Sequence, residues 1–426
     1  MIKMIIKKLF PKKLLLFYHY FLSKTASWYY NNPSKKLIVI GVTGTNGKTT
    51  TTNIISQLLE CLGHKTGLVS TVNFKIGDKE WLNNKKMTML GRWQTQKIIK
   101  QMLKDNCKYV IIETSSQGIE QFRHKGIDYN LVIFTNLTPE HIEAHGGFKN
   151  YRAAKEKLFK HLSEGKSKKF KKIIISNIDD KETERLKKFP VDKFITYGFK
   201  NKADYRGEDL KLENGLVSFS LNNKKFKTPF LGEFNGYNIL AGISTVVTLG
   251  FDLYKIMNCK LKTVPGRQEF IKEKQNFKIL IDYAPEPESL KQLYKALKNF
   301  PKNKIIHVLG SCGGGRDKNR QPILGEIASN KAEVVIITNE DPYDDDPQEI
   351  INNIARGALK NKKILNKNLF KIKNREQAIK KALQLAEKDD LVLITGKGAE
   401  QAICVANGKK IEWDDRKVVK KLIKLL

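Results

Sequence analysis

The chain has 426 residues, enough for two or three domains that each bury a core of their own. Hydrophobic residues make up 40% of it and charged residues 29%, a balance that excludes a disordered chain and an integral membrane protein. The formal charge is +34, but lysines are spread along the whole chain and no aromatic-basic RNA motif occurs, so we favour a lysine-rich composition over affinity for nucleic acid or anionic lipid.

The cysteines are five in number and widely scattered, with no C-x-x-C pair: Cys61, Cys107, Cys259, Cys312 and Cys404. An odd set without paired spacing predicts neither disulfide bonds nor structural zinc. It is typical of a reducing compartment, so we expect a cytoplasmic protein.

Residues 1–36 carry eight lysines and no acidic residue around the apolar run Leu14–Leu22. That run is too short for the roughly 20 residues that span a bilayer, and no small-x-small cleavage site follows it. We predict a basic amphipathic helix that begins near Pro11 and ends before Pro33. Packing on the next domain is favoured over peripheral contact with an anionic membrane.

The next stretch joins an apolar run to a glycine-punctuated loop, Leu37-Ile-Val-Ile-Gly-Val-Thr-Gly-Thr-Asn-Gly-Lys-Thr-Thr50. β-Branched residues predict a buried parallel strand up to Val42, and a helix is expected from about Thr49 until just before Gly63. A strand, loop and helix in this order indicate a site for a nucleoside triphosphate, with an ordinary strand-to-helix turn as the alternative.

The loop residues suit that ligand chemically. Gly44 and Gly47 let backbone N–H groups turn toward phosphate oxygens. Lys48 supplies a positive charge, and the Thr49 hydroxyl is placed for Mg²⁺ at the positive terminus of the helix. The match to the generic pattern is imperfect, because that pattern has glycine six positions before the lysine, where this chain has Val42.

Later apolar runs alternate with helix-length polar segments and predict an α/β protein with a mainly parallel sheet. The first runs are 109–113, 131–136 and 173–177. Asn-Gly and Asn-Asn turns between 197 and 230 predict hairpins at the edge of that sheet. After a hinge at Val264-Pro-Gly-Arg267, strands at 277–282, 305–310, 334–338 and 391–395 predict a second, Rossmann-like α/β domain with a doubly wound sheet.

Two polar residues follow strands of the first predicted sheet. Glu113 stands at a strand end, where parallel sheets bind ligands, so we expect it at the nucleotide's Mg²⁺; a surface carboxylate that caps the next helix is the alternative. His141 follows the next strand and is favoured as a metal ligand over a structural histidine. Lys155 lies on an amphipathic helix and, on pattern alone, is a solvated lysine.

Six motifs occur in a fixed order: the loop 43–50, Glu-x-Ser-Ser at 113–116, Asn-Leu-x-x-Glu-His at 136–141, Tyr-x-x-Ala-Lys-x-x-Leu-Phe at 151–159, Phe-Asn-x-x-Asn at 234–238 and Pro-Gly-Arg at 265–267. Over residues 37–426 this succession resembles the Mur ligase family, the ATP-dependent amide-forming enzymes of peptidoglycan synthesis. The resemblance is closest to members that add the third stem residue to UDP-N-acetylmuramoyl-dipeptide. After the basic amphipathic segment 1–36, it implies a central ATP-binding domain 37–265 and a C-terminal domain 266–426.

The resemblance also implies roles for individual residues. ATP would be held by Gly44, Thr45, Asn46, Gly47, Lys48, Thr49 and Thr50, by Asn235 and Asn238 on the adenine side, and by Arg267 and Asp282 from the second domain. Two Mg²⁺ ions would be bound. Thr49 would bind the first ion, and His141 with a carbamylated Lys155 would bind the second. Glu113 would bind both ions. Lys48, Glu113, His141 and Lys155 would thus act in catalysis. The substrate carboxylate would attack the γ-phosphorus, and an amine would then attack the acyl phosphate to give an amide, ADP and phosphate.

Substrate residues follow from the same likeness. Thr88, Ser115, Gln121 and Arg123 would hold a muramoyl-peptide acceptor, and Arg316, Asp341, Tyr343, Gly396 and Glu400 the incoming amino acid. We therefore expect small-molecule partners, no nucleic acid and a monomer. Departures from the family pattern are Gln117, Pro285 and Ala399, each in place of a histidine, and a basic segment where the family carries its uridine-binding N-terminal domain.

The pattern also predicts the amino acid. Members that use meso-diaminopimelate carry Asp-Asn-Pro-Arg, whose arginine can hold the distal carboxylate in a bidentate pair. Here the motif is Glu340-Asp-Pro-Tyr343, followed by Asp344-Asp-Asp346, which favours a distal ammonium and hence lysine or another basic diamino acid. The alternative is that these aspartates face solvent and cap a helix that begins near Pro347.

Two other functions share part of the pattern. A ligase like folylpolyglutamate synthase has the same loop and lysine, but Glu-x-Ser-Ser and Gly-Lys-Gly-x-Glu favour the muramoyl branch. A basic P-loop protein that acts on nucleic acid is the alternative from a different class.

Overall fold

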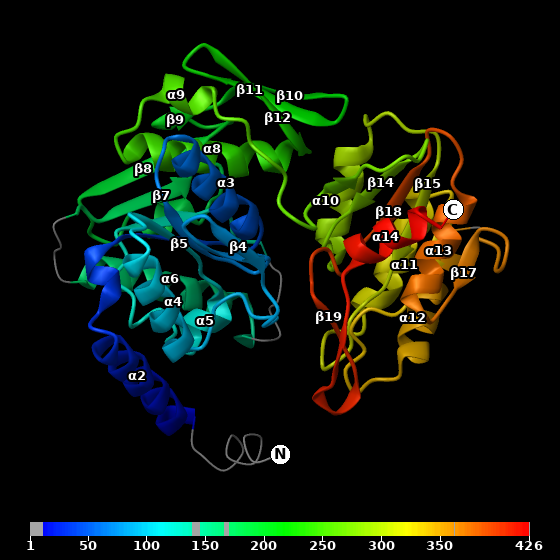
Figure 1. Cartoon of the computed structure of the whole chain (residues 1–426), viewed down its shortest axis with the longest axis horizontal. Coiled ribbons are helices and arrows are strands. Elements are labelled where there is room, and N and C mark those ends of the chain that lie inside the picture. Colours follow the sequence, from blue (N-terminus) through cyan, green and yellow to red (C-terminus); the bar gives the residue numbers. More distant parts are fainter. Residues whose placement is uncertain (1–11, 139–144, 166–169, 362, 426) are drawn as a thin grey trace. The chain divides into compact units, whose positions relative to one another are not determined.

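The computed structural model describes residues 12–138, 145–165, 170–361 and 363–425. The chain forms two compact units (Figure 1). The first runs up to Leu210 and adds Phe219–Phe226 and Phe234–Lys262; the second comprises Lys211–Ser218, Lys227–Glu233 and the chain from Thr263 onward. Within the described residues, no helix is both long and apolar enough to cross a bilayer.

The first unit is built on one large sheet whose described strands lie in the order β4-β3-β2-β5-β1-β6-β7-β8-β9. All neighbours are parallel except β2 with β3 and β3 with β4, which confirms a mainly parallel sheet. The strands are β1 (Ile38–Thr43), β2 (Thr66–Val69), β3 (Asn73–Ile76), β4 (Lys79–Leu82), β5 (Tyr109–Glu113), β6 (Leu131–Phe134), β7 (Ile173–Asn177), β8 (Lys193–Gly198) and β9 (Tyr205–Arg206).

Helices cover both faces of this sheet. On one face, Ile99 and Leu158 pack in a core with Val39 and Val110. On the other, α3 and α8 approach so closely that a Cβ at Gly242 would meet Ile54 Cγ2 at 2.5 Å. The described helices of this unit are α2 (Lys12–Tyr29), η1 (Pro33–Lys36), α3 (Lys48–Cys61), α4 (Arg92–Lys104), α5 (Ser116–Glu120), α6 (Phe148–Glu164), α7 (Thr183–Leu186), α8 (Glu233–Thr248) and α9 (Leu253–Met257).

Helix α2 confirms the helix predicted between the two prolines. It packs on the first unit, where the Ser23 hydroxyl donates to the Phe122 carbonyl at 2.8 Å and the Ser27 hydroxyl to the Gly126 carbonyl at 3.1 Å. Packing on the following domain is therefore confirmed as well.

The predicted hairpins form, but as a sheet of their own. Strands β10 (Glu208–Glu213), β11 (Leu216–Leu221) and β12 (Lys224–Leu231) pair in that order. Asn214 and Gly215, then Asn222 and Asn223, adopt positive φ in the two turns, as tight hairpins require. The prediction that they extend the edge of the large sheet was wrong, because the two-residue strand β9 ends that sheet.

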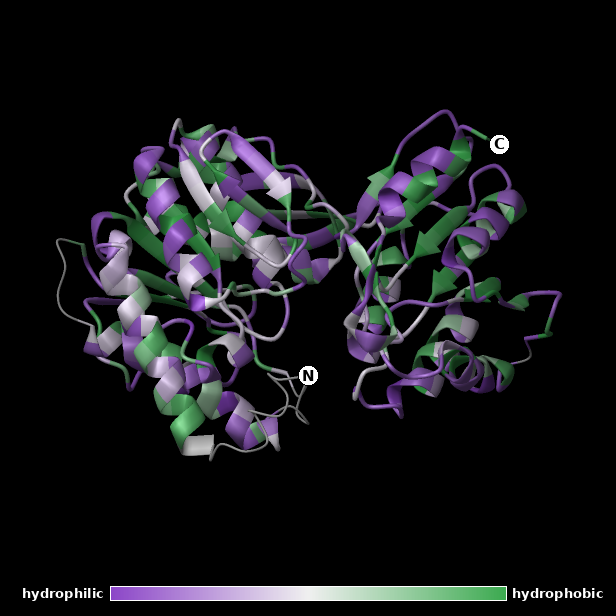
Figure 2. Ribbon diagram, turned by 60° about the horizontal axis from the view of Figure 1, so that its bottom comes forward, coloured by the Kyte–Doolittle hydropathy of each residue, from purple (hydrophilic) through white to green (hydrophobic). Residues whose placement is uncertain are grey.

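The second unit carries a sheet in the order β13-β14-β18-β15-β16-β17, parallel except for β13 with β14. Leu391 and Leu393 of β18 face one core while Val392 and Ile394 face another, so the doubly wound sheet is confirmed. In Figure 2 the strands inside this unit are largely hydrophobic and the outward helix faces hydrophilic. Its elements are β13 (Glu269–Ile271), β14 (Lys278–Ile281), α10 (Pro287–Leu297), β15 (Ile305–Leu309), α11 (Arg320–Lys331), β16 (Val334–Ile337), α12 (Pro347–Leu359), β17 (Leu369–Lys371), α13 (Arg375–Leu385), β18 (Leu391–Ile394), β19 (Ala402–Cys404), η3 (Ala406–Gly408), β20 (Lys410–Glu412) and α14 (Asp415–Ile423).

One prediction about the cysteines was wrong. Cys61, the last residue of α3, forms a disulfide bond with Cys259, which follows α9, across a sequence separation of 198 residues. Scattered spacing had indicated no pairing, but the fold places the two Cα atoms 5.8 Å apart. Cys107, Cys312 and Cys404 are free thiols, as predicted.

Candidate active site

The loop between β1 and α3 is held in shape by the end of the neighbouring strand β6. The Asn46 backbone N–H donates to Asn136 Oδ1 at 2.9 Å, the Thr45 N–H to the Asn136 carbonyl at 2.8 Å, and the Thr135 hydroxyl to the Asn46 carbonyl at 2.7 Å. The loop is therefore preorganised by its surroundings.

Glycine is required at two points of the loop. Gly44 and Gly47 have φ of 154° and 81°; a Cβ would meet Thr135 Oγ1 at 1.9 Å in the first case and Asn238 Oδ1 at 2.1 Å in the second. A positive φ and a neighbouring atom in the Cβ position together strongly disfavour any side chain at these two positions. The backbone is thus open toward a ligand in the way that phosphate loops are.

Two lysines lie against this loop. Lys48 Nζ donates to the Thr45 carbonyl at 2.6 Å. Lys155, on α6, is 3% exposed; its Nζ donates to the Gly44 carbonyl at 2.7 Å and lies 4.7 Å from the centre of the Tyr151 ring. The interpretation of Lys155 as a solvated lysine was wrong, because α6 turns this side chain inward beneath the loop.

A carboxylate lies at the first turn of α3. Glu113, at the end of β5 and 2% exposed, accepts a hydrogen bond at 2.9 Å from the Thr49 hydroxyl and one at 2.7 Å from the Thr71 N–H. Glu113 therefore faces the nucleotide loop, as the strand-end argument predicted. Capping of the next helix is done by Ser115, whose side chain accepts from the Gly118 N–H.

The first turns of α8 reach the same loop. Asn238 Nδ2 donates to Asn235 Oδ1 at 2.9 Å, and both side chains are buried. Asn238 Oδ1 lies beside Gly47 and accepts at 3.5 Å from the Thr51 hydroxyl. Residues predicted on the adenine side thus come together with the loop, although they lie far from it in sequence.

The four predicted acceptor residues lie on two segments that contact each other. Arg123 donates to Gln121 Oε1 at 2.7 Å and also to the Met89 carbonyl, next to Thr88. Thr88 accepts at 2.9 Å from the hydroxyl of Thr71, whose N–H is bound to Glu113. Hydrogen bonds therefore link the acceptor set to the carboxylate at the loop. Ser115 lies on the same segment as Gln121 and caps α5.

His141 lies outside the described residues, so its predicted role as a metal ligand has no structural counterpart here. Among the residues that are described, no group of three or more His, Cys, Asp or Glu side chains could hold a metal ion. Oxygen donors do converge at Glu113 and Thr49, which suits Mg²⁺ as a hard cation.

The second unit places its two predicted nucleotide residues side by side. Asp282 accepts a hydrogen bond of 2.8 Å from the Gln268 N–H, next to Arg267, whose guanidinium lies 4.3 Å from the centre of the Tyr283 ring. Burial raises the pKa of Asp282 to about 6, against the opposing effect of the Arg267 charge.

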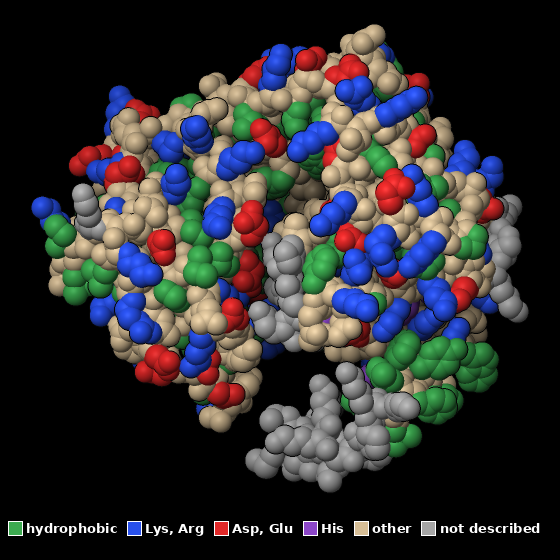
Figure 3. Space-filling view, turned by 180° about the vertical axis from the view of Figure 1, so that it is seen from behind, with side chains coloured by type: hydrophobic (Ala, Val, Ile, Leu, Met, Phe, Trp, Pro, Cys, Tyr) green, Lys and Arg blue, Asp and Glu red, His purple; other side chains and the backbone are tan. Residues whose placement is uncertain are grey.

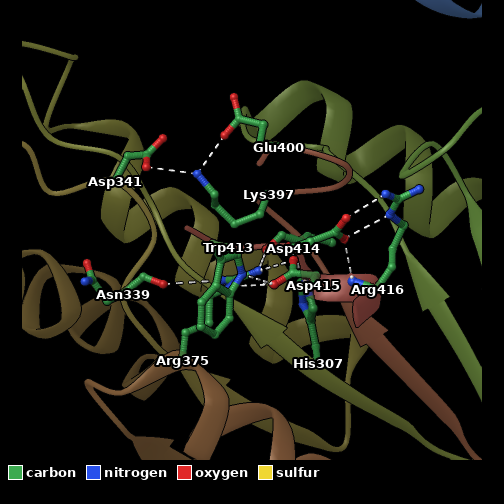
Figure 4. A network of polar contacts seen from close by, with 11 residues as sticks. His307, Asn339, Asp341, Arg375, Lys397, Glu400, Trp413, Asp414, Asp415 and Arg416 are labelled. Atoms are coloured by element: carbon green, nitrogen blue, oxygen red, sulfur yellow. Dashed lines mark hydrogen bonds and ion pairs between the residues drawn. The ribbon is translucent and has the colours of Figure 1, made fainter. Parts of the chain in front are cut away.

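A buried ionic network underlies the predicted amino-acid pocket (Figure 4). Lys397, 0% exposed, donates to Asp341 Oδ1 at 2.9 Å and to Glu400 Oε2 at 2.7 Å. Nearby, Arg375 binds both carboxylate oxygens of Asp415 and donates to the Thr395 carbonyl. Because each buried cation has carboxylate partners, the network is satisfied and can hold the Gly396–Glu400 loop in one geometry.

Tyr343 is positioned by its backbone. It has φ of 53°, rare for an aromatic residue; its N–H donates to the Cys404 carbonyl at 3.1 Å, and its ring packs on Gly314. The aspartates that follow bind backbone N–H groups: Asp344 that of Asn407, Asp345 that of Gly314, and Asp346 that of Gln348 as the cap of α12. The capping alternative is thus confirmed for Asp346. Arg316 is exposed in the loop that follows β15.

Sequence reasoning missed several residues that hold the site. Thr71 is detectable only from the fold, because parallel pairing of β2 with β5 brings its N–H to Glu113. Asn136 and Tyr151 stand in recognised motifs but had no assigned role. Lys397 likewise lies inside a recognised motif, between Gly396 and Glu400, but had no assigned role.

The fold and this loop define an ATP-dependent enzyme of the P-loop class, with a second α/β unit after it in the chain. Residues 42–246 match the Mur ligase middle domain, and residues 266–398 the glutamate ligase domain of Mur ligases. The chain belongs to the Mur ligase family, whose members are ADP-forming amide ligases of peptidoglycan synthesis.

Named relatives support this assignment. The chain is 36% identical over 394 residues to the UDP-N-acetylmuramoyl-L-alanyl-D-glutamate–2,6-diaminopimelate ligase of Geobacillus kaustophilus, covering 91% of this chain and 78% of that protein. It is 38% identical over 398 residues to ligase 1 of the same name from Clostridium acetobutylicum, with the same coverage. A solved structure of such a ligase superposes with a TM-score of 0.62 at 30% identity, over 91% of this chain and 78% of that one.

Proposed function

We propose that this ligase extends a muramoyl-dipeptide acceptor by one diamino acid, through an acyl phosphate. The observation that carries the proposal is the chain of contacts from the loop glycines through Thr49 and Glu113 to Thr71 and Thr88. It links a phosphate cradle to the segment assigned to the acceptor, as a transfer from ATP to an acceptor carboxylate requires.

The loop and its lysine bind the triphosphate in this proposal. Backbone N–H groups from Gly44 to Thr50 hold the phosphates, and Lys48 exchanges its bond to the Thr45 carbonyl for a phosphate oxygen. Asn235 and Asn238 face the adenine side, and Arg267 and Asp282 contribute from the second unit. The proposed domain boundaries are 37–265 and 266–426.

Two Mg²⁺ ions are proposed for this site. Thr49 and Glu113 would hold the first, and Glu113, His141 and a carbamylated Lys155 the second. When bound, Mg²⁺ offsets the negative charge of the phosphates and of the approaching carboxylate. The burial of Lys155 and its bond to the Gly44 carbonyl favour such a role, because a carbamate on Nζ supplies the oxygen ligands that the amine lacks.

Thr88, Ser115, Gln121 and Arg123 are proposed to bind the acceptor, and Arg316, Asp341, Tyr343, Gly396 and Glu400 the amino acid. The relatives reported above are named for 2,6-diaminopimelate. Members that use that substrate carry arginine where this chain has Tyr343. Tyrosine cannot form the bidentate pair of hydrogen bonds with the distal carboxylate. A diamino acid with a distal ammonium and no second carboxylate, such as lysine, is therefore the proposed substrate.

We further propose that the enzyme works in the cytoplasm as a monomer, on small molecules alone, with peripheral membrane contact through residues 1–36.

The test is ADP formation by the purified chain with UDP-muramoyl-dipeptide and a panel of amino acids. Pteroyl-glutamate and RNA are each tested in place of the muramoyl acceptor. Turnover that needs the muramoyl acceptor together with a diamino acid, and that Lys48→Ala abolishes, is the expected result. Stimulation by pteroyl-glutamate or RNA in the absence of muramoyl-dipeptide would refute the assignment.

A further inference from the structure

Helix α2 presents its apolar residues to solvent. Phe17 is 66% exposed, Phe21 57% and Trp28 75%, and Leu14 and Tyr18 are also exposed. Their spacing of three, four and seven residues places all five on one face of the helix. Figure 3 shows hydrophobic side chains gathered over α2, at the lower right of that view.

The face that α2 turns to the protein carries smaller and aliphatic side chains, with Leu15, Leu16 and Leu22 partly buried. Ser23, Ala26 and Ser27 are its buried members, and two of them hydrogen-bond to backbone carbonyls of the first unit. A helix that packs only on its own domain would turn its aromatic residues inward, because burying aromatic surface is favourable. Within the described part of the chain, the outward apolar face is therefore left largely to solvent.

The sequence around this helix is basic. Residues 1–36 contain eight lysines and no acidic residue. Lys24 is exposed on α2 itself. The charges of Lys24 and Lys160 both act to lower the pKa of Lys125, so these three lysines lie near one another. Two acidic groups lie in this surrounding: Glu164, which pairs with Lys160 at 3.5 Å, and Asp128, which hydrogen-bonds to Ser34. The surroundings of the apolar face thus favour an anionic partner.

We propose that the outward face of α2, formed by Leu14, Phe17, Tyr18, Phe21 and Trp28, docks in the plane of an anionic lipid membrane. A helix of 18 residues with one aromatic face and basic flanks fits the interface, where tryptophan and tyrosine partition, and α2 is not a candidate to span it. A hydrophobic groove on a protein partner would also explain the apolar helix face. It would not explain why residues 1–36 contain lysines and no acidic residue, whereas an anionic membrane explains both. This inference specifies the lipid class and the face for the proposed membrane contact, and it does not depend on the ligase substrate.

The experiment is co-sedimentation of the full chain with vesicles of phosphatidylcholine alone and of phosphatidylcholine mixed equally with phosphatidylglycerol. The test variant is Phe17→Glu with Phe21→Glu. The matched control is Ile364→Glu with Ile411→Glu, which makes the same charge change at two exposed apolar residues of the second unit. If thermal unfolding shows that the test variant is not folded, Leu14→Glu with Trp28→Glu replaces it on the same face.

We expect the wild type and the control to bind the mixed vesicles, with weaker binding to phosphatidylcholine alone and at high salt. The test variant should lose at least about tenfold in partitioning, because it places two acids in the apolar interface. Equal binding of test and control variants would overturn the proposal. So would a lipid-free dimer that the test variant dissociates, since a second copy would then be the occupant. ADP formation in solution should be unchanged in the test variant. The vesicle result therefore stands or fails independently of the ligase assay.

Discussion

The Thr49 hydroxyl donates a 2.9 Å hydrogen bond to the carboxylate of Glu113, 64 residues further along the chain. The contact joins the first turn of α3 to the end of β5, the strand that pairs in parallel with β1. Parallel pairing places the two carboxyl ends together, so a carboxylate at the end of β5 must face the start of the helix that follows β1. Glu113 is therefore held ready at the phosphate loop before any ligand binds.

The first prediction concerns Glu113→Gln. The amide can still accept from Thr49 and Thr71 but no longer carries charge for a cation, so the Mg²⁺-dependent part of ATP affinity should fall at least about tenfold. Affinity for ATP without Mg²⁺ should change little. Titration calorimetry with and without Mg²⁺ measures both, and the exposed Glu164→Gln is the control. The same Mg²⁺ dependence in both variants would contradict the assignment.

The second prediction compares two glycines of positive φ at the two ends of α3. Gly63 has φ of 84° with no atom within 4 Å of a Cβ, whereas a Cβ at Gly47 meets Asn238 Oδ1 at 2.1 Å. Gly63→Ala should cost about 1–2 kcal/mol of stability, for left-handed backbone alone. Gly47→Ala should cost more and should also abolish nucleotide binding. Denaturant unfolding and nucleotide titration of both variants separate backbone strain from the collision in the loop.

The loop and its neighbours could be predicted because the signals are local or follow a general rule of parallel sheets. The run from β1 into α3 carries β-branched residues, positive-φ glycines and a charged residue in fixed order, and Glu113 follows from the strand-end rule. Lys155 could not be placed from its pattern, since its burial depends on the packing of α6 beneath Gly44.

Other features depend on contacts that no local pattern records. Strands β3 and β4 are four residues long and partly exposed, so they carry little periodicity. The Cys61–Cys259 bond forms between two segments that only the packing of the first unit brings together. The separate sheet of β10–β12 likewise depends on where β9 ends and not on the hairpin turns, which were recognisable.

The disulfide bond gives the third prediction. It ties the end of α3 to the segment after α9, where Gln57 also exchanges two hydrogen bonds with the backbone of Lys262. Closing a loop this long restricts the unfolded chain, so the oxidised protein should be about 2–4 kcal/mol more stable than the reduced one. Chemical denaturation with and without a thiol reductant measures the difference. Cys61→Ser should remove the response to reductant and Cys107→Ser should keep it; a response in Cys61→Ser would contradict the bond.

The fourth prediction concerns pH. Burial and the neighbouring Asp341 raise the pKa of Glu340 to about 7, and its Oε2 has no hydrogen-bond partner among the residues that the structure describes. Because the folded pKa lies above the unfolded value near 4.5, this group's stabilisation is complete below about pH 4.5 and is lost as the pH rises through about 7. Glu340→Gln removes that dependence, so its stability relative to wild type should increase with pH, by on the order of 3 kcal/mol at pH 8.

Unfolding of both proteins between pH 4.5 and 8 checks this trend. His307 acts in the opposite sense, because burial lowers its pKa to about 3, so its stabilisation is present above about pH 6.5 and lost as the pH falls toward 3. Since both proteins keep His307, the difference between them isolates Glu340. A difference that does not vary with pH would mean that Glu340 ionises in the folded protein as easily as in the unfolded one.

The last prediction concerns the residue that should set amino-acid preference. Tyr343 is held at φ of 53° with its ring against Gly314, and a strained backbone of this kind is a feature of sites that must place one side chain accurately. Its hydroxyl can offer a distal carboxylate a single neutral hydrogen bond, whereas an arginine there offers two charged ones. Tyr343→Arg should therefore raise kcat/KM for meso-diaminopimelate relative to lysine by at least about tenfold, which corresponds to about 1.4 kcal/mol. Asn366→Arg adds the same charge at another exposed position of positive φ in the second unit and should leave the ratio unchanged. If the wild type already prefers meso-diaminopimelate, Tyr343 does not select against the second carboxylate, and that group must be held by another part of the pocket, with Arg316 as the first residue to test.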